Sequence, residues 1–464
     1  MSAEPTFLSA VSDFLDRHCL LDGVGCAVVG VSGGVDSMVC LDVLRRRGVD
    51  VVAAHVNYGL RPAADDDEAL VRTWCDRQDP PLPLRVRTAD PTAEAEAGAS
   101  LQAVARRQRY RFFRAVAREV GADAVAVGHH RDDQAETLLL HLLRGAGPEG
   151  LSGMPPARPV HGAPELRLLR PLLSRRRSEI EAYAEAAGIP WCVDATNEST
   201  DYRRGWIRTQ VLPLLEAEVE GATDAIARSA DLMRAYVDET VAPALRQRFD
   251  AARISDAGPG LLLDLATLRA EPPVWRHRLL LEALRQTLPN APQKKAVAEE
   301  IAALVDAQVG RRVDLAGGSV WRERPGLRFL PAAERPDPVP LTPLAPQTAV
   351  ATPDGDLTLA VTPDRPPAVR TADPTVAVAD ADRIAGSLAV RSWTAGDRFR
   401  PLGLEGTMLV SDLLTDAKVA PHRRPAACVV VDDDGIAWVV GHRLAHRVRV
   451  QPSTQRYAVL RLDP

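Results

Sequence analysis

The chain has 464 residues, an apolar share of 46% and a net charge of −5. This length predicts about two to four domains, and the apolar share is sufficient for buried cores. The negative charge excludes a global positive field, so a nucleic-acid partner would have to bind local basic patches. No apolar run approaches the roughly 20 residues that cross a bilayer, and the first residues lack the basic stretch of a secretion signal. We therefore expect a cytoplasmic protein that does not contact a membrane.

Cysteine and lysine usage narrows the chemistry further. The six cysteines are scattered, and no pair has the C-x-x-C spacing of a zinc site or a redox motif. The 57 basic residues include only three lysines, so 54 are arginines, and the first lysine is Lys294. Chemistry that requires a lysine side chain is therefore excluded from the first 293 residues.

Predicted helices and strands alternate along the first 215 residues. An amphipathic helix within 1–22 precedes a continuous apolar run at 26–31, which is typical of a strand buried on both faces. A helix is then expected at 38–46 and a strand at 51–54. Further helices are predicted at 64–78, 101–120 and 131–144, and further strands at 82–87 and 124–127. This alternation predicts a doubly wound parallel α/β sheet in a domain spanning 1–215.

The character of the chain changes after this α/β domain. Residues 216–330 are rich in Ala, Leu, Arg and Glu and predict a domain that is helical throughout. Residues 331–380 are dense in proline and predict a linker. Short β-like runs then indicate a small α+β domain over 381–464. These runs lie at 388–390, 428–431, 437–440 and 447–450.

The hexapeptide after the first buried strand has the chemistry of a phosphate-binding loop. It consists of Ser32, Gly33, Gly34, Val35, Asp36 and Ser37. Two glycines let backbone N–H groups approach phosphate oxygens, and the N-terminus of the next helix adds positive potential. Asp36 cannot bind phosphate directly, so we expect it to hold Mg²⁺. A plain Gly-Gly turn is the structural alternative, and the complete strand–loop–helix context argues against it.

This loop is not a Walker A motif, because that motif requires a lysine on the phosphates and residues 1–293 contain none. The hexapeptide is similar to the PP-loop of ATP pyrophosphatases, which cleave ATP to AMP and pyrophosphate. The resemblance implies ATP and Mg²⁺ as the cofactors of this domain.

A second polar cluster follows the strand predicted at 124–127, where the sequence reads GHHRDDQAET over 128–137. In open parallel sheets, ligands bind at the carboxyl ends of the strands. Asp132, Asp133 and Glu136 share one helical face, which can hold Mg²⁺ or an ammonium group. First-turn acids also stabilise a helix through its dipole, but that explains one acid more easily than three. His55 and Asn57 end another strand at the same edge, and we expect both beside ATP.

The ordered set of motifs resembles one PP-loop family, the tRNA(Ile)-lysidine synthetases. The motifs in the first domain are SGGVDS at 32–37, HVNYGLR at 55–61, ARRQRY at 105–110, GHHRDDQAET at 128–137, LLRGAG at 142–147, GLSGM at 150–154 and DATN at 194–197, followed by Arg204 and Arg208. GDRFRP at 396–401 and GHR at 441–443 resemble the C-terminal domain of this family. The family usually has His where Tyr58 stands and Asn where Gly205 stands.

The resemblance implies that the enzyme ligates free L-lysine to C2 of the wobble cytidine of the isoleucine tRNA with the CAU anticodon. The reaction would proceed through an adenylated tRNA and release AMP and pyrophosphate. Candidates for catalysis and lysine binding are Arg106, Arg109, His129, Asp132, Asp133 and Glu136. Candidates for tRNA binding are Arg111, Arg114, Arg204, Arg208, Arg398, Arg400 and Arg443. Contacts between such arginines and phosphates position an RNA without specifying its sequence.

Two alternatives remain at this point. Another PP-loop enzyme that modifies tRNA, a thiolase, would need paired cysteines for sulfur delivery, and the scattered cysteines argue against it. A non-catalytic module that binds nucleotide or RNA would not need the acids at the strand ends. The sequence does not determine the oligomeric state, and a homodimer is compatible with it.

Overall fold

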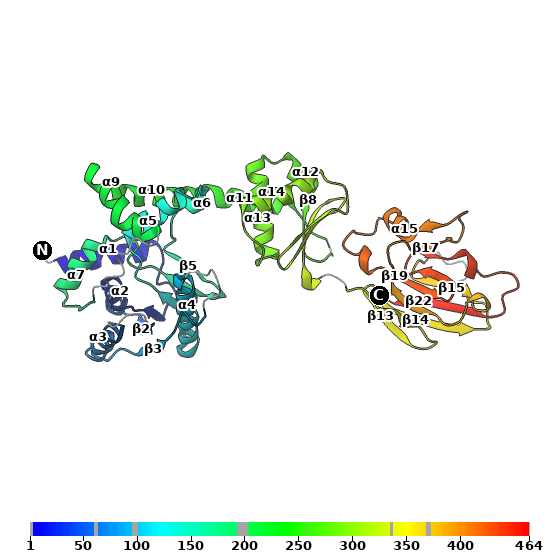
Figure 1. The fold of residues 1–464 in the computed structure, drawn as a ribbon, viewed down its shortest axis with the longest axis horizontal. Helices are drawn as coiled ribbons and strands as arrows, with labels where there is room; N and C mark the ends of the chain where they lie inside the picture. The colour runs from blue at the N-terminus through cyan, green and yellow to red at the C-terminus, as the bar shows by residue number, and fades with distance from the viewer. Residues whose placement is uncertain are drawn as a thin grey trace. The chain divides into compact units, whose positions relative to one another are not determined.

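The computed structural model describes residues 3–59, 64–94, 101–192, 203–256, 258–334, 337–367 and 373–463. The chain divides into two compact units, Met1–Ala242 and Pro243–Pro464 (Figure 1). The predicted boundary at residue 215 falls inside the first unit. The DATN motif and the last two residues of HVNYGLR lie outside the described residues.

The first unit contains a six-stranded sheet with the order β3-β2-β1-β4-β6-β5. All neighbours pair in parallel except β5 and β6, which are antiparallel at one edge. The strands are β1 Cys26–Gly30, β2 Asp50–Asn57, β3 Leu84–Thr88, β4 Ala124–Ala126, β5 Ala157–Val160 and β6 Ala163–Leu169. The chain builds outward from β1 to β3 and then continues on the other side of β1 with β4. The predicted doubly wound α/β fold is confirmed.

Helices cover both faces of this sheet, which explains why its central strands are apolar on both sides. One face packs against α1, α2, α3 and α7, and the other packs against α4 through Phe112, Phe113 and Val116. The helices of the unit are α1 Ala3–Arg17, α2 Val35–Arg46, α3 Ala64–Asp76, α4 Leu101–Val120, α5 Arg131–Leu142, α6 Pro148–Leu151, α7 Arg177–Ala186, α8 Arg203–Trp206, α9 Leu212–Glu218 and α10 Ala222–Tyr236. π-Helical turns at Ile207–Val211 and Val237–Val241 continue α8 and α10.

The first unit also includes α10, which packs against α5 and α6. Ala135 of α5 forms a small apolar cluster with Ile207 and Leu212, and this cluster fixes the segment that follows α8. Helices α8 and α10 therefore both contact α5, whose N-terminal part carries the predicted acids.

The second unit begins with helices around an antiparallel sheet that the sequence analysis did not predict. The sheet has the order β7-β8-β11-β10-β9 and packs against α13 and α14 around Leu279, Leu284 and Phe329. Its strands are β7 Arg253–Ile254, β8 Leu261–Asp264, β9 Arg312–Leu315, β10 Gly318–Arg322 and β11 Gly326–Pro331. Its helices are α11 Ala242–Ala252, α12 Leu265–Ala270, α13 Pro273–Thr287 and α14 Lys295–Ala302. A short 3₁₀ turn at Ala303–Asp306 follows α14.

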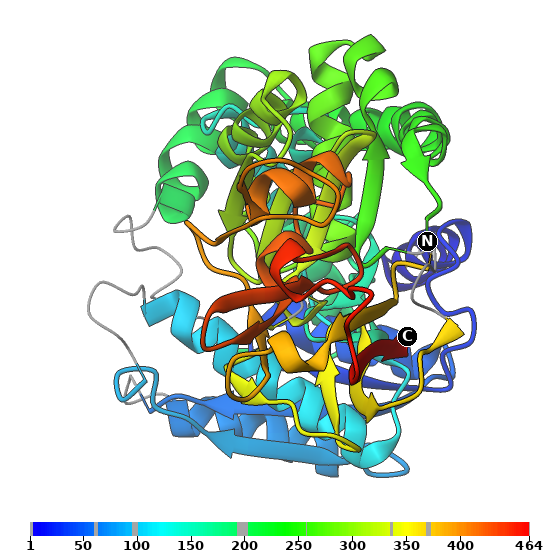
Figure 2. The same cartoon turned by 90° about the vertical axis from the view of Figure 1, so that its right-hand side faces the viewer.

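The last part of the chain forms two antiparallel sheets, β12-β16-β19-β20-β21 and β13-β14-β22-β15, and the short ladder β17-β18. These strands, yellow to red in Figures 1 and 2, surround a core that includes Trp438 and Leu460. The strands are β12 Thr342–Pro343, β13 Ala349–Thr352, β14 Gly355–Thr362, β15 Val376–Asp380, β16 Ala389–Ser392, β17 Arg398–Phe399, β18 Met408–Leu409, β19 Cys428–Asp432, β20 Gly435–Val439, β21 Arg443–Leu444 and β22 Tyr457–Asp463, with one helix, α15 Val410–Asp416.

Two details of this part differ from the sequence-based expectation. Strands β12 to β15 lie within the proline-rich stretch 331–380, where prolines and turns separate short runs of chain. The run at 447–450 is not a strand, since His446–Val448 forms a 3₁₀ turn and Arg449 makes only an isolated bridge to Ala379. The other three predicted β-like runs coincide with strands.

Candidate functional site

A cavity of about 320 Å³ opens where β1 and β4 end, at the switch point of the doubly wound sheet. Parallel sheets bind ligands at this point because the loops after the two strands diverge there. The lining includes most of the predicted phosphate loop and several of the predicted catalytic residues. It consists of Gly30, Val31, Ser32, Gly34, Val35, Asp36, Ser37, Ala54, Val56, Tyr58, Arg106, Arg109, Tyr110, Phe113, Val127, Gly128, His129, His130, Asp133, Arg177, Cys192 and Arg208.

The glycine loop is held in shape by its two serines. The Ser37 hydroxyl donates to the Gly34 carbonyl at 2.8 Å and accepts from the Ser32 backbone N–H at 3.0 Å. Gly33 has a φ of +89°, a left-handed backbone conformation that a residue with a Cβ rarely adopts. The loop then runs into α2 at Val35, so the first N–H groups of that helix face the cavity edge. This is the geometry of an anion site.

The glycine loop also touches the end of β4 closely. A Cβ on Gly128 would lie 2.5 Å from the Asp36 carbonyl oxygen and 2.9 Å from the Ser37 backbone nitrogen. Both neighbours are backbone atoms, so neither can move without disturbing the start of α2. Glycine at position 128 therefore lets the two walls of the cavity meet.

Asp36 points its carboxylate toward the second wall of the cavity. Its Oδ1 lies 3.8 Å from His130 Nε2, and its Oδ2 lies 3.9 Å from Arg177 Nη1. Oδ1 is buried and has no hydrogen-bond partner among the described residues. Burial raises the pKa of Asp36, although His130 and Arg177 oppose that shift. Such a carboxylate gains from any cation brought beside it.

His130 lies between three carboxylates. Its nitrogens are 3.4 Å from Asp132, 3.6 Å from Asp133 and 3.8 Å from Asp36. Burial alone would lower the pKa of the imidazole, but Asp133, with Asp132 and Asp36, raises that pKa to about 9. The ring therefore carries a positive charge at neutral pH. Sequence reasoning named only His129 of the pair, and the signal for His130 was the same motif.

The acids of α5 are paired with arginines of the segment that begins at α8. Arg204 donates to Glu136 at 2.6 Å and to Asp133 at 2.9 Å, and Arg208 donates to Glu136 at 2.6 Å. Burial opposes ionisation of Asp133, yet His130 and Arg204 lower its pKa. Arg204 and Arg208 were predicted to bind tRNA, and that role stays a prediction. Here they neutralise Glu136, whose side chain is 1% exposed.

His129 has the opposite electrostatic state from His130. Burial lowers the pKa of His129 to about 3, so this imidazole stays neutral. Its Nδ1 accepts a hydrogen bond from Arg170 Nε at 3.3 Å, which fixes the proton on Nε2. Burial also lowers the pKa of Arg170 to about 10. The cavity is therefore lined by a neutral imidazole that can form hydrogen bonds, His129, and by a positively charged one, His130.

Other predicted residues lie just outside the cavity lining. His55 is buried and its Nδ1 lies 3.0 Å from the Val31 carbonyl, so it fixes the end of β1. Asn57 donates to Asp65 at 2.9 Å and to Glu68 at 3.2 Å. Asp132 forms an ion pair with Arg176, and Glu136 forms ion pairs with Arg204 and Arg208. The ATP-binding roles of His55 and Asn57 remain predictions.

Helix α4 supplies the opposite rim of the cavity. Arg106 and Arg109 are exposed residues on this helix, and Arg106 lies 5.1 Å from the centre of the Tyr110 ring. Tyr58 donates a hydrogen bond to the Ala105 carbonyl at 2.8 Å and thereby ties β2 to α4. The predicted role of the two arginines in lysine binding stays a prediction.

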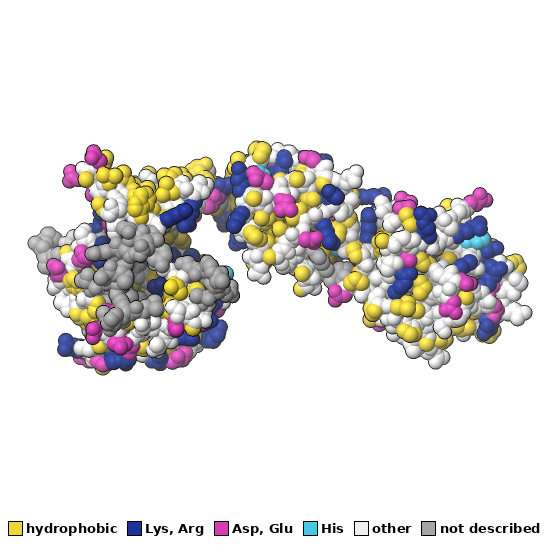
Figure 3. All heavy atoms as spheres, in the orientation of Figure 1, with side chains coloured by type: hydrophobic (Ala, Val, Ile, Leu, Met, Phe, Trp, Pro, Cys, Tyr) yellow, Lys and Arg dark blue, Asp and Glu magenta, His cyan; other side chains and the backbone are white. Residues whose placement is uncertain are grey.

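The remaining arginines predicted to bind tRNA fall into two groups. Arg111 pairs with Glu94 at 2.7 Å, and Arg114 donates to the His161 carbonyl at 3.0 Å. Arg398, Arg400 and Arg443 are exposed in the last part of the chain. In Figure 3, dark blue Lys and Arg side chains are spread over the visible face of that part, with acids between them.

Two kinds of site are absent from the part of the chain that the structure describes. No group of three or more His, Cys, Asp or Glu side chains in the described parts of the chain is arranged to hold a metal ion. None of the described helices combines the length and the apolar character needed to cross a membrane.

The glycine loop at the sheet's switch point defines a nucleotide-binding PP-loop domain, and a family model described as a PP-loop domain matches residues 6–215. Models described as the TilS substrate binding domain and the TilS substrate C-terminal domain match residues 263–328 and 388–462. These three matches follow the chain in order, with one in the first unit and two in the second.

Relatives of full length agree with these models. The chain is 34% identical to a tRNA(Ile)-lysidine synthase of Symbiobacterium thermophilum, over 97% of this chain and 96% of that protein. It is 32% identical to a tRNA(Ile)-lysidine synthase of Geobacter sulfurreducens, over 100% of this chain and 98% of that protein. A third, from Parabacteroides distasonis, is 31% identical over 96% of this chain and 98% of that protein. The chain belongs to the tRNA(Ile)-lysidine synthase family, whose members are PP-loop ligases that use ATP and act in tRNA modification.

Proposed function

We propose that this enzyme joins free L-lysine to C2 of the wobble cytidine in the isoleucine tRNA with the CAU anticodon. The observation that supports this proposal most strongly is the composition of the cavity. A phosphate-binding loop, the low-pKa carboxylate of Asp133 and two arginines of α4 all line this cavity. One cavity thus offers sites for a nucleotide and for an amino acid with two positive charges.

The first step we propose is adenylation of the cytosine. The cytosine O2 attacks the α-phosphorus of ATP, a new O–P bond forms, and the bond to pyrophosphate breaks. Backbone N–H groups of the glycine loop and the Ser32 hydroxyl hold the phosphates, and the Ser37 hydroxyl keeps the loop in shape by donating to the Gly34 carbonyl. The imidazolium of His130 and the guanidinium of Arg177 face the same space, where they stabilise negative charge that develops on the phosphates.

The second step is attack of a lysine amine on C2. A C–N bond forms, the C2–O bond breaks, and AMP leaves with the former cytosine oxygen. Asp133 binds the second ammonium group of lysine, and Arg109 or Arg106 binds its carboxylate. Because its pKa is lowered, Asp133 is a charge partner and a poor base. The proton lost from the attacking amine therefore goes to solvent or phosphate.

Asp36 is our candidate for holding Mg²⁺. Its buried Oδ1 lacks a hydrogen-bond partner among the described residues, and its pKa is raised by burial, so a cation fits there. One carboxylate together with phosphate oxygens is a common set of ligands for this ion. When bound, the ion would offset negative charge on the leaving pyrophosphate.

The two steps can be separated by their products. The enzyme is incubated with ATP and unmodified isoleucine tRNA, with and without lysine, and pyrophosphate and AMP are measured separately. We expect pyrophosphate to depend on the tRNA alone and AMP to depend on both tRNA and lysine. A tRNA whose wobble cytidine is replaced by uridine is the matched control and should yield neither product. Release of AMP without lysine would contradict the proposal.

A further inference from the structure

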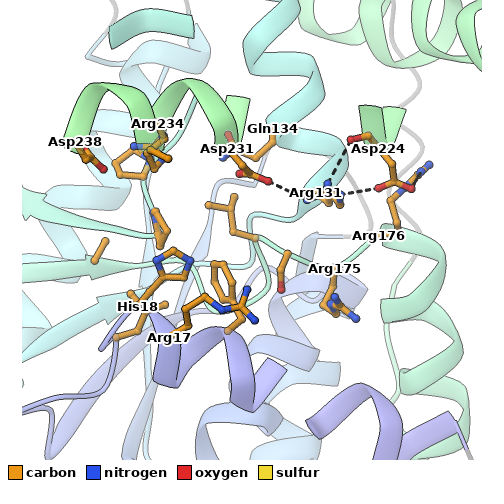
Figure 4. A pocket seen from close by; sticks show the side chains of 18 of the residues that line it. Arg17, His18, Arg131, Gln134, Arg175, Arg176, Asp224, Asp231, Arg234 and Asp238 are labelled. Carbon is orange, nitrogen blue, oxygen red and sulfur yellow. Dashed lines mark hydrogen bonds and ion pairs between the residues drawn. The ribbon is translucent and has the colours of Figure 1, made fainter. Parts of the chain in front are cut away.

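The carboxylate of Asp224 in α10 binds two arginines that come from different segments beside the ATP cavity. Asp224 Oδ1 accepts from Arg131 Nε at 2.6 Å, and Asp224 Oδ2 accepts from Arg176 Nη1 at 3.0 Å. The Asp224 carbonyl accepts a further bond from Arg131 Nη2 at 3.3 Å. Figure 4 shows Asp224 with Arg131 and Arg176 on either side. Arg131 opens α5, and Arg176 immediately precedes α7.

Arg176 and its neighbour Arg177 also bind Asp132, one of the acids of α5. Arg176 Nε donates to Asp132 Oδ1 at 3.2 Å, and the Arg177 backbone N–H donates to Asp132 Oδ2 at 2.9 Å. Asp132 is therefore held from two directions, and its neighbour Asp133 lines the ATP cavity. Arg177 lines the same cavity from the other segment. Asp224 is thus connected to the start of α5 directly through Arg131 and also through Arg176 and Asp132. Arg176 itself belongs to the segment that precedes α7.

Asp224 itself lies away from the reacting groups. It lines a different cavity of about 1020 Å³, bounded also by Arg17, His18 and Arg234. Its side chain is 33% exposed, and it is not among the residues that line the ATP cavity. Any effect of Asp224 on the chemistry must therefore act through the arginines that it holds.

We propose that Asp224 is a positioning residue for the first turn of α5 and for the segment 174–177. The inference rests on the proposed function, since it concerns the geometry of that reaction. Ion-paired arginines on both segments keep Asp133 and Arg177 at a fixed separation across the cavity. Displacements of about 1 Å at such groups lower rates by up to about 100-fold without touching the substrate. Asp224 therefore controls turnover and leaves the phosphate loop intact.

The test compares Asp224→Asn with Asp231→Asn. Asp231 is a matched control because it lies on the same helix and reaches Arg131 at 3.4 Å, with a side chain that is 55% exposed. We expect Asp224→Asn to lower kcat for lysine-dependent AMP release by about tenfold to 100-fold. The KM for ATP should stay within about twofold in both variants, and kcat of Asp231→Asn should also stay within about twofold. Asp224→Glu keeps the charge and should recover most of kcat.

Two further measurements separate positioning from loss of fold. Amide hydrogen exchange of 129–136 should be faster in Asp224→Asn than in Asp231→Asn. The double variant Asp224→Asn with Arg176→Gln should lose less than the sum of the two single losses, because both substitutions break the contact between Asp224 and Arg176. A raised KM with unchanged kcat, equal losses in both aspartate variants, unchanged exchange, or additive losses would each overturn the inference. A wild-type enzyme without lysine-dependent AMP release would count against the proposed function instead, and the exchange measurement would still decide this inference.

Discussion

Arginines in two regions of this molecule have very different surroundings. Around α5, Arg131 and Arg176 meet Asp224 at 2.6 and 3.0 Å, and Arg204 and Arg208 each meet Glu136 at 2.6 Å. In the last part of the chain, Arg398, Arg400 and Arg443 are exposed to solvent. The first group organises carboxylates inside the protein, whereas the second is available to an external polyanion. The comparison shows that arginine content alone does not mark an RNA-binding surface.

The largest loss of stability is expected when a carboxylate is removed from the arginine cluster around α5. Glu136→Gln would leave Arg204 and Arg208 with Asp133 as their remaining partner at this point of α5. Removing one member of a buried ion cluster costs about 3 kcal/mol, because the charges left behind lose their compensation. We expect the midpoint of urea unfolding of the first unit to fall accordingly, together with a loss of turnover.

The matched control for that experiment is Glu119→Gln. Glu119 pairs with Arg85 at 2.9 Å, and both side chains are about half exposed, at 56% and 41%. Exposed pairs contribute about 0–1 kcal/mol, so this variant should unfold almost like the wild type. Equal destabilisation by the two substitutions would contradict the distinction between the two kinds of arginine environment.

The exposed group should behave in the opposite way. Arg398→Gln and Arg443→Gln should leave the unfolding midpoint unchanged and weaken binding of tRNA. Each lost phosphate contact should reduce the slope of log affinity against log salt by about 1. Filter binding of the tRNA over a series of salt concentrations measures this slope. A lowered unfolding midpoint with an unchanged slope would assign these arginines a structural role.

At neutral pH the smallest effect is expected from the neutral member of the histidine pair, because its effect on stability depends on acid pH. His129 has a pKa of about 3 in the folded protein and an ordinary value in the unfolded chain. Between about pH 3 and pH 6.5 the unfolded chain binds the extra proton, so stability falls as pH falls through this window. His129→Asn should remove up to about 1.4 kcal/mol of that loss per pH unit. Thermal midpoints of both proteins between pH 4 and pH 8 test this, and equal acid slopes would contradict it.

The α/β part of the fold could be predicted because its physics is local. Strand β1 is continuously apolar, and Gly33 in the loop after it has a positive φ that a residue with a Cβ rarely adopts. The sheet β7–β11 could not be predicted in this way. Its strand β8 reads Leu261-Leu-Leu-Asp264, and a short leucine-rich run has no periodicity that separates strand from helix. Packing against α13 and α14 decides its conformation.

The candidate site was predictable in its residue types and less so in their partners. The phosphate loop and the acids of α5 follow from motif chemistry. The pairing of Arg204 with Asp133 joins positions 71 residues apart, and nothing in either motif indicates it. The same holds for Asp224, which belongs to no motif and contacts the wall only because α10 packs against α5. Positions of charge partners are a property of the folded chain.

The most direct test of the central claim follows labelled lysine into RNA. The enzyme is supplied with ATP, radiolabelled L-lysine and unmodified isoleucine tRNA, and the purified tRNA is digested to nucleosides. We predict that the label is found on the nucleoside derived from the wobble cytidine, and that Ser37→Ala with Asp36→Asn abolishes it. Label that is absent from the tRNA, or found on another nucleoside, would contradict the account.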